Sequence, residues 1–290
     1  MDKLTRKACE SVLHLAFKYP WLKPKTDALM TLLFEDCETD DQAQLIIDIL
    51  DQLKYITMHE YNSYLSDLAL DIATCGIEPE SSFIVAMSAD SKADSGQSVL
   101  YDLKNELSKI EWKGYRSVNR YDQTPKAYKE FKTSKGAQTI NIVLVDNFVG
   151  SGSTVINRVK RIEELFNQSG FPKPNIYVKV LISTISGKDN INSEDIDFSF
   201  FSLVNDKLLE RIYEPDQVEV KKDLMRSLES KLAPSYNERV LPSLGYGESQ
   251  VAISIENKNT PNNVFPILWW KYYSDQRVRN VLLHRAMDDA

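Results

Sequence analysis

Long apolar runs are missing from this sequence. No stretch of its 290 residues approaches the roughly 20 consecutive apolar residues that a membrane-spanning helix needs. The N-terminal segment MDKLTRKACESVLHLAF also lacks the small-residue cleavage site that ends a secretory signal peptide. We therefore predict a soluble protein that works in the cytoplasm and has no membrane partner.

Cysteine and histidine are also scarce, with three residues of each type. They are Cys9, Cys37 and Cys75, and His14, His59 and His284. Widely spaced cysteines without a Cys-x-x-Cys pair fit neither a disulfide framework nor a zinc site. Cys9 and His14 lie five residues apart on an expected helix and do not share a face, which favours core packing over ligation or thiol chemistry. We predict no metal ion bound directly by protein side chains.

Excess positive charge is absent from the chain as a whole, because the net charge is −7. Bulk electrostatics therefore do not favour nonspecific binding to nucleic acid. Residues 102–135 are an exception, with nine basic and five acidic residues. This bias suits a polyanionic ligand, and a solvated helix face has the same composition, so both interpretations stay open. Taken alone, residues 102–135 would favour nucleic-acid binding as the function of the protein.

Apolar spacing divides the chain into two parts. Between residues 3 and 74, apolar residues recur every three or four positions, which predicts three or four helices. From residue 82 onward, short β-rich runs alternate with helical stretches, and the runs lie at 83–87, 140–145, 175–183, 198–204 and 250–256. This alternation predicts an α/β fold with a mostly parallel sheet flanked by helices. We expect a helical N-terminal region at 1–78, an α/β domain at 79–290, and a short helix at 277–287.

The segment NIVLVDNFVGSGSTVINRVKRIEEL, residues 141–165, carries the clearest chemical signal. A buried strand ends in Asp146 and Asn147, and the helix that follows opens with Gly150, Ser151, Gly152, Ser153 and Thr154. Glycines let a backbone approach a ligand closely, while hydroxyls and free helix-start amides donate to anionic oxygens. The segment predicts a phosphate site with a carboxylate placed for sugar hydroxyls. It lacks the lysine of a Walker loop and the Gly-x-Gly-x-x-Gly spacing, and a strand–turn–helix junction remains the structural alternative.

The segment VLVDNFVGSGST, residues 143–154, resembles the phosphoribosyl-diphosphate (PRPP) motif of type I phosphoribosyltransferases. The resemblance implies that Asp146 binds the ribose hydroxyls and that residues 150–154 bind the 5′-phosphate. It also implies Mg²⁺ bound through PRPP. The motif has an acidic residue at the position of Asn147. Because asparagine is uncharged, this departure puts in question whether the chain stabilises a cationic transition state.

The same resemblance assigns roles to two further segments. It implies a pyrophosphate loop after the first strand of the domain, here Ser88, Asp90, Lys92, Ser95 and Gly96. It also implies a flexible loop within residues 115–138, with Arg116, Arg120 and Lys126 closing over pyrophosphate and excluding water. An ordinary polar loop and a surface excursion are the alternatives for these two segments.

The C-terminal text from Leu244 to Trp270 resembles phosphoribosyltransferase-like proteins of bacterial conflict systems, including effectors encoded beside retron reverse transcriptases. The matching features are Gly-Tyr-Gly at 245–247, Asn-Thr-Pro-Asn-Asn at 259–263 and Pro-x-x-Trp at 266–269. The resemblance implies a C-terminal hood at about 205–290 in which Asn259, Asn262, Asn263 and Trp269 bind a base. A structural turn followed by core residues is the alternative.

These observations together lead to one functional expectation and one alternative. We expect a phosphoribosyltransferase-like effector of a bacterial antiphage, retron-type system that binds PRPP or a related nucleotide and cleaves or transfers at ribose carbon 1. Its partners would be a reverse transcriptase and the DNA product of that enzyme. The alternative is a catalytically inactive protein of the same fold that senses a nucleotide or docks a partner, as Asn147 suggests.

Overall fold

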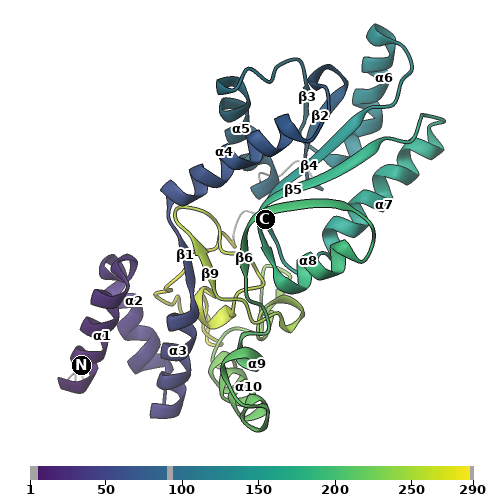
Figure 1. Cartoon of the computed structure of the whole chain (residues 1–290). Coiled ribbons are helices and arrows are strands. Elements are labelled where there is room, and N and C mark those ends of the chain that lie inside the picture. Colours follow the sequence, from purple (N-terminus) through teal and green to yellow (C-terminus); the bar gives the residue numbers. More distant parts are fainter. Residues whose placement is uncertain (1–5, 90–93, 288–290) are drawn as a thin grey trace. The chain divides into compact units, whose positions relative to one another are not determined.

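The computed structural model describes residues 6–89 and 94–287, with the side chains of residues 6–9 excluded (Figure 1). The chain forms two compact units. Unit 1 consists of Met1–Thr57 together with Asn205–Ala290, and unit 2 consists of Met58–Val204. Within the described residues, no helix combines the length and the apolar character needed to cross a bilayer.

Unit 2 contains a five-stranded sheet that is parallel throughout. Its strands are β2 (Ser82–Ala86), β3 (Arg116–Val118), β4 (Asn141–Val149), β5 (Asn175–Thr184) and β6 (Asp197–Val204), in the spatial order β3-β2-β4-β5-β6. β4 is central, and its apolar side chains from Ile142 to Val145 are fully buried. The predicted α/β fold with a mostly parallel sheet is confirmed.

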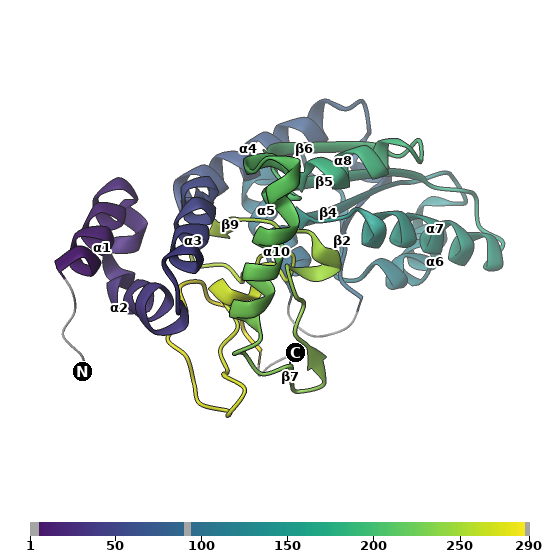
Figure 2. The same cartoon turned by 90° about the horizontal axis from the view of Figure 1, so that it is seen from below.

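Helices cover both faces of this sheet. The helices of unit 2 are α4 (Met58–Thr74), α5 (Ser95–Lys109), α6 (Thr124–Lys135), α7 (Ser153–Gln168) and α8 (Ile185–Asn192), with the short 3-10 helices η3 (Pro79–Ser81) and η4 (Tyr121–Gln123). Figure 2 shows α6 and α7 on one side of the strands and α4 on the other. Aromatic and aliphatic side chains of α6 and α7, such as Phe131 and Phe166, form one core with residues of β2, β4 and β5.

A buried charged network ties α4 to the sheet. Lys179 of β5 is 2% exposed, and its ammonium lies 2.6 Å from the Asp71 carboxylate of α4. The Ser199 hydroxyl donates to the same carboxylate at 2.7 Å. Because a buried charge requires a partner, this network holds α4 in unit 2. The boundary that we expected at residues 78 and 79 therefore differs from the observed division, in which α4 belongs with the sheet.

Unit 1 joins the N-terminal helices to the C-terminal part of the chain. Its elements are α1 (Arg6–Lys18), η1 (Pro20–Lys25), α2 (Thr26–Met30), the π-helix η2 (Thr31–Asp36), α3 (Asp40–Gln52), β1 (Lys54–Ile56), α9 (Leu208–Ile212), α10 (Pro215–Glu229), β7 (Ser235–Tyr236), β8 (Arg239–Val240), η5 (Tyr246–Glu248), β9 (Ile253–Ile255) and η6 (Pro266–Leu268). β1 pairs in parallel with β9, and β7 pairs with β8. The grouping of residues 1–57 with 205–290 follows from these long-range pairings.

The helix that we predicted at residues 277–287 is wrong. This stretch forms isolated hydrogen bonds with distant backbone instead, such as Leu283 N to Leu268 O at 2.8 Å. Arg279 lies within it, is 4% exposed and forms a buried ion pair with Asp36. Its guanidinium also donates to the carbonyls of Trp270 at 2.9 Å and Ile267 at 3.0 Å. These tertiary bonds replace the local bonds of a helix.

Candidate functional site

The strand order of unit 2 has a switch point at the carboxyl ends of β2 and β4, the position where open α/β sheets form their ligand crevice. β2 leads through α5 to β3 on one side of the sheet, whereas β4 leads through α7 to β5 on the other side. Connections that diverge from two adjacent parallel strands leave a gap at the carboxyl ends of those strands, where open α/β sheets bind their ligands. The segment after β2 and the Gly150–Gly152 loop after β4 border this gap.

Asp146 lies near the end of β4 and is held in place by two donors. Its Oδ1 accepts a hydrogen bond from the Ser95 hydroxyl at 2.7 Å and another from the Asn147 amide at 2.7 Å. Burial raises the pKa of Asp146 to about 6, while the hydrogen bonds from Ser95 and Asn147 act in the opposite direction. Since both bonds use one oxygen, Oδ2 is the atom available for a ligand.

The start of α5 is fitted closely against the ends of both strands. Asp94 caps the helix by accepting from Gln97 N at 3.1 Å, and the Ser88 hydroxyl donates to the same carboxylate. A Cβ atom at Gly96 would lie 3.0 Å from Met87 N. Glycine therefore allows the helix start to approach β2, and this approach brings Ser95 to Asp146. Of the expected pyrophosphate loop, Asp90 and Lys92 lie outside the described residues.

The backbone of the 150–154 loop is fixed by the end of β5 and by α8. Gly150 O accepts from the Thr184 hydroxyl at 2.8 Å, and Ser151 O accepts from the Asn190 side chain at 3.0 Å. Gly152 has a φ of +80°, and a Cβ there would lie 2.9 Å from Ile191 Cγ1. These contacts engage the carbonyl side of the loop and leave its amide side for a ligand.

Donors gather at the start of α7. The side chains of Ser151, Ser153 and Thr154 are exposed, and the Ser151 and Ser153 hydroxyls lie 3.1 Å apart. No side chain caps the helix, and in the described part of the chain the amides of Thr154 and Val155 have no acceptor. Orphan amides at a helix start together with hydroxyls form an anion-binding arrangement. The geometry fits a phosphate group.

Arg158 is a residue of this site that sequence reasoning missed. Its guanidinium lies 4.3 Å from the centre of the Tyr121 ring, and its buried Nε has no hydrogen-bond partner. Its positive charge also lowers the pKa of Asp146, although by less than burial raises it. The Tyr121 amide in turn donates to Ser88 O at 3.4 Å. A cation one helical turn after Thr154 was the signal available in the sequence.

The substitution Arg158→Gln tests this residue. We expect the affinity for an anion such as inorganic phosphate to fall about tenfold, because a hydrogen bond to a charged group contributes roughly 1.5–3 kcal/mol. Titration calorimetry with inorganic phosphate measures the change. Arg161→Gln is the matched control, since Arg161 lies on the same helix and pairs with Glu164 at 2.9 Å. Equal losses in the two variants would contradict a role for Arg158.

A comparison with protein families decides the classification of the chain. A model of the PRTase-CE family matches residues 34–278. The chain belongs to the PRTase-CE family. It is a type I phosphoribosyltransferase-like protein, and the PRTase-CE match includes the whole of β4 and the loop that follows it.

Solved structures show only remote likeness to the PRTase-CE chain. A hypothetical protein from Neisseria gonorrhoeae with bound ppGpp is 15% identical, with 53% of this chain and 85% of that chain covered and a TM-score of 0.35. Hypoxanthine-guanine phosphoribosyltransferase from Schistosoma mansoni in complex with IMP is 16% identical over 50% and 65% of the two chains, with a TM-score of 0.34. Orotate phosphoribosyltransferase from Mycobacterium tuberculosis in complex with PRPP is 10% identical over 56% and 96%, with a TM-score of 0.30. No curated protein matches the chain significantly.

In the PRTase-CE chain, the three cations of the expected flexible loop lie on a crossover connection formed by β3, η4 and α6. Arg116 is in β3, 5.6 Å from the centre of the Phe131 ring. Arg120 follows β3 and pairs with Asp122, with Nε 2.9 Å from Oδ1. Lys126 is exposed on α6. Of the three, Arg120 lies two residues after the carboxyl end of β3, at the same edge of the sheet as the ends of β2 and β4.

The expected base-binding residues belong to unit 1, where most of them form structural contacts. Trp269 is 2% exposed, and its Nε1 donates to Val264 O at 2.9 Å. Asn263 is 8% exposed and donates to the Ser249 hydroxyl at 3.3 Å, while Asn262 O accepts from Tyr246 N at 2.8 Å. Asn259 Oδ1 accepts from Ala286 N at 2.9 Å. Trp269 therefore stabilises the core of unit 1 and offers no open face to a base.

The acidic side chains that the structure describes at this site lie apart from one another. Among residues 10–89 and 94–287, no three His, Cys, Asp or Glu side chains are grouped to hold an ion. Asp146 borders the crevice, and one of its oxygens is already engaged by Ser95 and Asn147. Such a site suits a cation that arrives with the ligand, bound mainly by ligand oxygens and water.

Proposed function

We propose that the crevice of unit 2 binds PRPP or a related ribose phosphate and promotes cleavage or transfer at ribose carbon 1. The supporting observation is the combination at one edge of the sheet of an anion-binding helix start with a carboxylate, in a member of the PRTase-CE family. The 150–154 loop would hold the 5′-phosphate. Oδ2 of Asp146 would accept hydrogen bonds from the ribose hydroxyls.

The chemistry that this arrangement supports is dissociative. The bond between ribose carbon 1 and the diphosphate oxygen breaks, the electron pair leaves with the diphosphate, and a nucleophile on a base or water completes the transfer. Ionised Asp146 favours the positive charge that develops on the ribose, and the fixed loop holds the sugar in register. Mg²⁺ bound through PRPP would neutralise the departing diphosphate.

Equilibrium binding and product release test this proposal separately. The full chain is titrated with PRPP and Mg²⁺, and diphosphate release is then followed with and without nucleobases. Binding with release supports the enzyme. The absence of PRPP binding up to millimolar concentrations overturns the proposal.

A catalytically inactive nucleotide sensor is the second candidate. Asn147 favours it, because this side chain replaces an acidic residue of the motif and is only 8% exposed. It therefore adds neither charge nor an open donor to the crevice. The sensor would be supported over the enzyme if the chain binds PRPP without releasing diphosphate and if the Asn147→Asp variant also binds PRPP without releasing diphosphate.

The affinity for PRPP should depend on pH around the pKa of Asp146. This pKa is raised to about 6, so the carboxyl takes up a proton as the pH falls through that value and ceases to accept from ribose hydroxyls. We expect affinity to fall, toward about tenfold per pH unit, below pH 6. The ligand phosphate titrates near the same pH, at about 6, so the series is repeated with Asp146→Asn. An identical slope in both proteins would contradict the assignment.

For the biological setting, we propose a cytoplasmic effector of a retron-type antiphage system, with a reverse transcriptase and its DNA product as partners. The support is the resemblance of the C-terminal segment and the close packing of its parts. A Cβ at Gly245 would lie 2.1 Å from Asn263 O, so the Gly-Tyr-Gly and Asn-rich segments require each other. Copurification of the full chain with the reverse transcriptase, and phage plating with Asp146→Asn, test this setting.

A further inference from the structure

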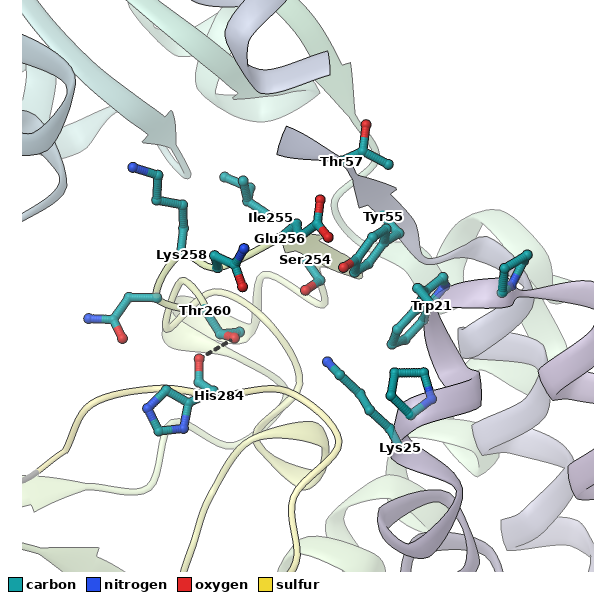
Figure 3. A pocket seen from close by; sticks show the side chains of 14 residues that line it. Trp21, Lys25, Tyr55, Thr57, Ser254, Ile255, Glu256, Lys258, Thr260 and His284 are labelled. Atoms are coloured by element: carbon teal, nitrogen blue, oxygen red, sulfur yellow. Dashed lines mark hydrogen bonds between the residues drawn. The ribbon is translucent and has the colours of Figure 1, made fainter. Parts of the chain in front are cut away.

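Unit 1 contains a cavity that the proposed function does not use. Its volume is about 1020 Å³, slightly above the range of about 300–1,000 Å³ that is usual for small-molecule sites (Figure 3). One wall comes from η1, with Trp21 and Lys25, and another from β1 and β9, with Tyr55, Ser254 and Glu256. All lining residues belong to unit 1, and none belongs to the 150–154 loop.

A flat aromatic pair forms part of the wall. The rings of Trp21 and Tyr55 are stacked, with centroids 4.9 Å apart and planes inclined by 5°. Both side chains are half-buried, so each ring is covered on one side by the other and remains partly accessible. β1 pairs with β9 through Tyr55 and Ser254, which fixes the position of the Tyr55 ring. The outer face of such a stacked pair offers a preformed flat apolar surface for a further planar ring.

A cation without a counter-charge is directed into the same cavity. Figure 3 shows the Lys25 ammonium pointing into the open space beside Trp21. Its Nζ donates to Leu282 O at 3.0 Å and lies 5.3 Å from the centre of the Trp21 ring. No carboxylate of the described residues forms an ion pair with it, and burial lowers the pKa of Lys25 with no opposing charge. A half-buried ammonium of this kind is completed by an anionic ligand group.

The rest of the lining gives the cavity a polarity along its length. Figure 3 shows the Tyr55 hydroxyl and the Glu256 carboxylate together at one end, and Thr260 and His284 at another. The negative charge of Glu256 contributes to raising the pKa of Tyr55, after the larger effect of burial. An anionic group is therefore disfavoured beside Glu256 and favoured beside Lys25. Hydroxyl or amino groups of a ligand are suited to the Glu256 end.

We propose that this cavity binds a nucleoside monophosphate, with the base stacked on the open face of the Trp21–Tyr55 pair and the phosphate on Lys25. The sugar hydroxyls or the exocyclic amino group of the base then donate toward Glu256 and Ser254. This inference does not depend on the phosphate loop of unit 2, because no residue of that loop lines the cavity.

Titration of the full chain with AMP, GMP, CMP and UMP tests the proposal. The Ser153→Glu background is used, because it places a carboxylate where the unit 2 loop would hold phosphate and so removes that competing site. We expect Lys25→Met to weaken nucleotide binding about tenfold or more and to leave adenosine binding nearly unchanged. Trp21→Leu should weaken both ligands, and Trp21→Phe should restore them in part.

Lys23→Met is the matched control. Lys23 lies on the same short helix, has a comparable cation–ring contact with Phe17 at 5.7 Å, and does not line the cavity. Two results overturn the proposal. One is an equal effect of Lys23→Met and Lys25→Met on nucleotide binding. The other is the absence of nucleotide binding up to about 10 mM, a concentration above the dissociation constants of ordinary specific ligands. Adding a single-stranded oligonucleotide that carries a terminal phosphate distinguishes the sources: competition by the oligonucleotide at equal concentration would identify a nucleic-acid end as the ligand in place of a free nucleotide.

Discussion

Asp146→Asn should produce a protein that is more stable and that binds PRPP poorly. The asparagine side chain keeps an oxygen for the Ser95 hydroxyl and the Asn147 amide, so both bonds in the folded protein survive. The substitution replaces the second carboxylate oxygen, which would accept hydrogen bonds from the two ribose hydroxyls, by an amide NH₂ group, and it removes the negative charge. We expect PRPP affinity to fall by about 30–100-fold, corresponding to roughly 2–3 kcal/mol.

The gain in stability follows from the direction of the pKa shift. Burial raises the pKa of Asp146 from 3.8 to about 6, so the folded state holds the proton more tightly than the unfolded state. Stability then decreases as the pH rises from about 4 to about 6, and the full penalty, on the order of 3 kcal/mol, applies above pH 6. Asparagine has no charge to bury. We expect Tm at a pH of about 8 to rise by several degrees and the difference to vanish near pH 4.

Inorganic phosphate separates the two effects of this substitution. The variant should bind phosphate as the unmodified chain does, because the loop donors are unchanged. Unaltered PRPP affinity, or a Tm difference that is the same at both pH values, would show that Asp146 does not have the role proposed here. Ser95→Ala provides a second check, since removing one donor should raise the pKa of Asp146 further.

The parts of the site that the sequence predicted are the parts that local sequence determines. The strand from Asn141, the carboxylate at Asp146 and the loop at Gly150 follow one another in the chain, and each has a distinct composition. The predicted strand ended at Val145, whereas β4 continues to Val149, because pairing with β5 extends along this segment. Long-range pairing of this kind is invisible in the residues of β4 alone.

The features that the sequence did not predict depend on contacts between distant segments. β3 has three residues, Arg116–Val118, and β1 has three, Lys54–Ile56, too few for a recognisable alternation. Ser95 was assigned to a leaving-group loop, and the structure shows its hydroxyl on Asp146 of a strand 51 positions away. Tryptophan is a residue type that stacks on bases, but Trp269 is buried by the surrounding residues of unit 1. The residues next to Trp269 in the sequence do not reveal this burial.

Gly187→Ala should displace the phosphate loop. A Cβ at this position in α8 would lie 2.1 Å from Gly150 O and 3.1 Å from the Thr184 hydroxyl, and both atoms belong to the contact that holds the loop. Because a backbone carbonyl cannot move aside alone, the loop must shift with it. We expect the free energy of unfolding to fall by about 1–3 kcal/mol, and the affinities for both PRPP and inorganic phosphate to fall at least tenfold.

Two further variants isolate the loop from general loss of structure. Gly170→Ala is the control, since Gly170 has a φ of +63° and nothing within 4 Å of its Cβ position, so it should cost about 1 kcal/mol and leave ligand binding intact. Thr184→Val is a milder change that removes the hydroxyl bonded to Gly150 O and Gly187 N without adding a clash. We propose that Asp146 binds the ribose and that the loop amides held in place by α8 bind the anion. Loss of phosphate binding with Asp146→Asn, together with its retention in Gly187→Ala and Thr184→Val, would contradict this proposal.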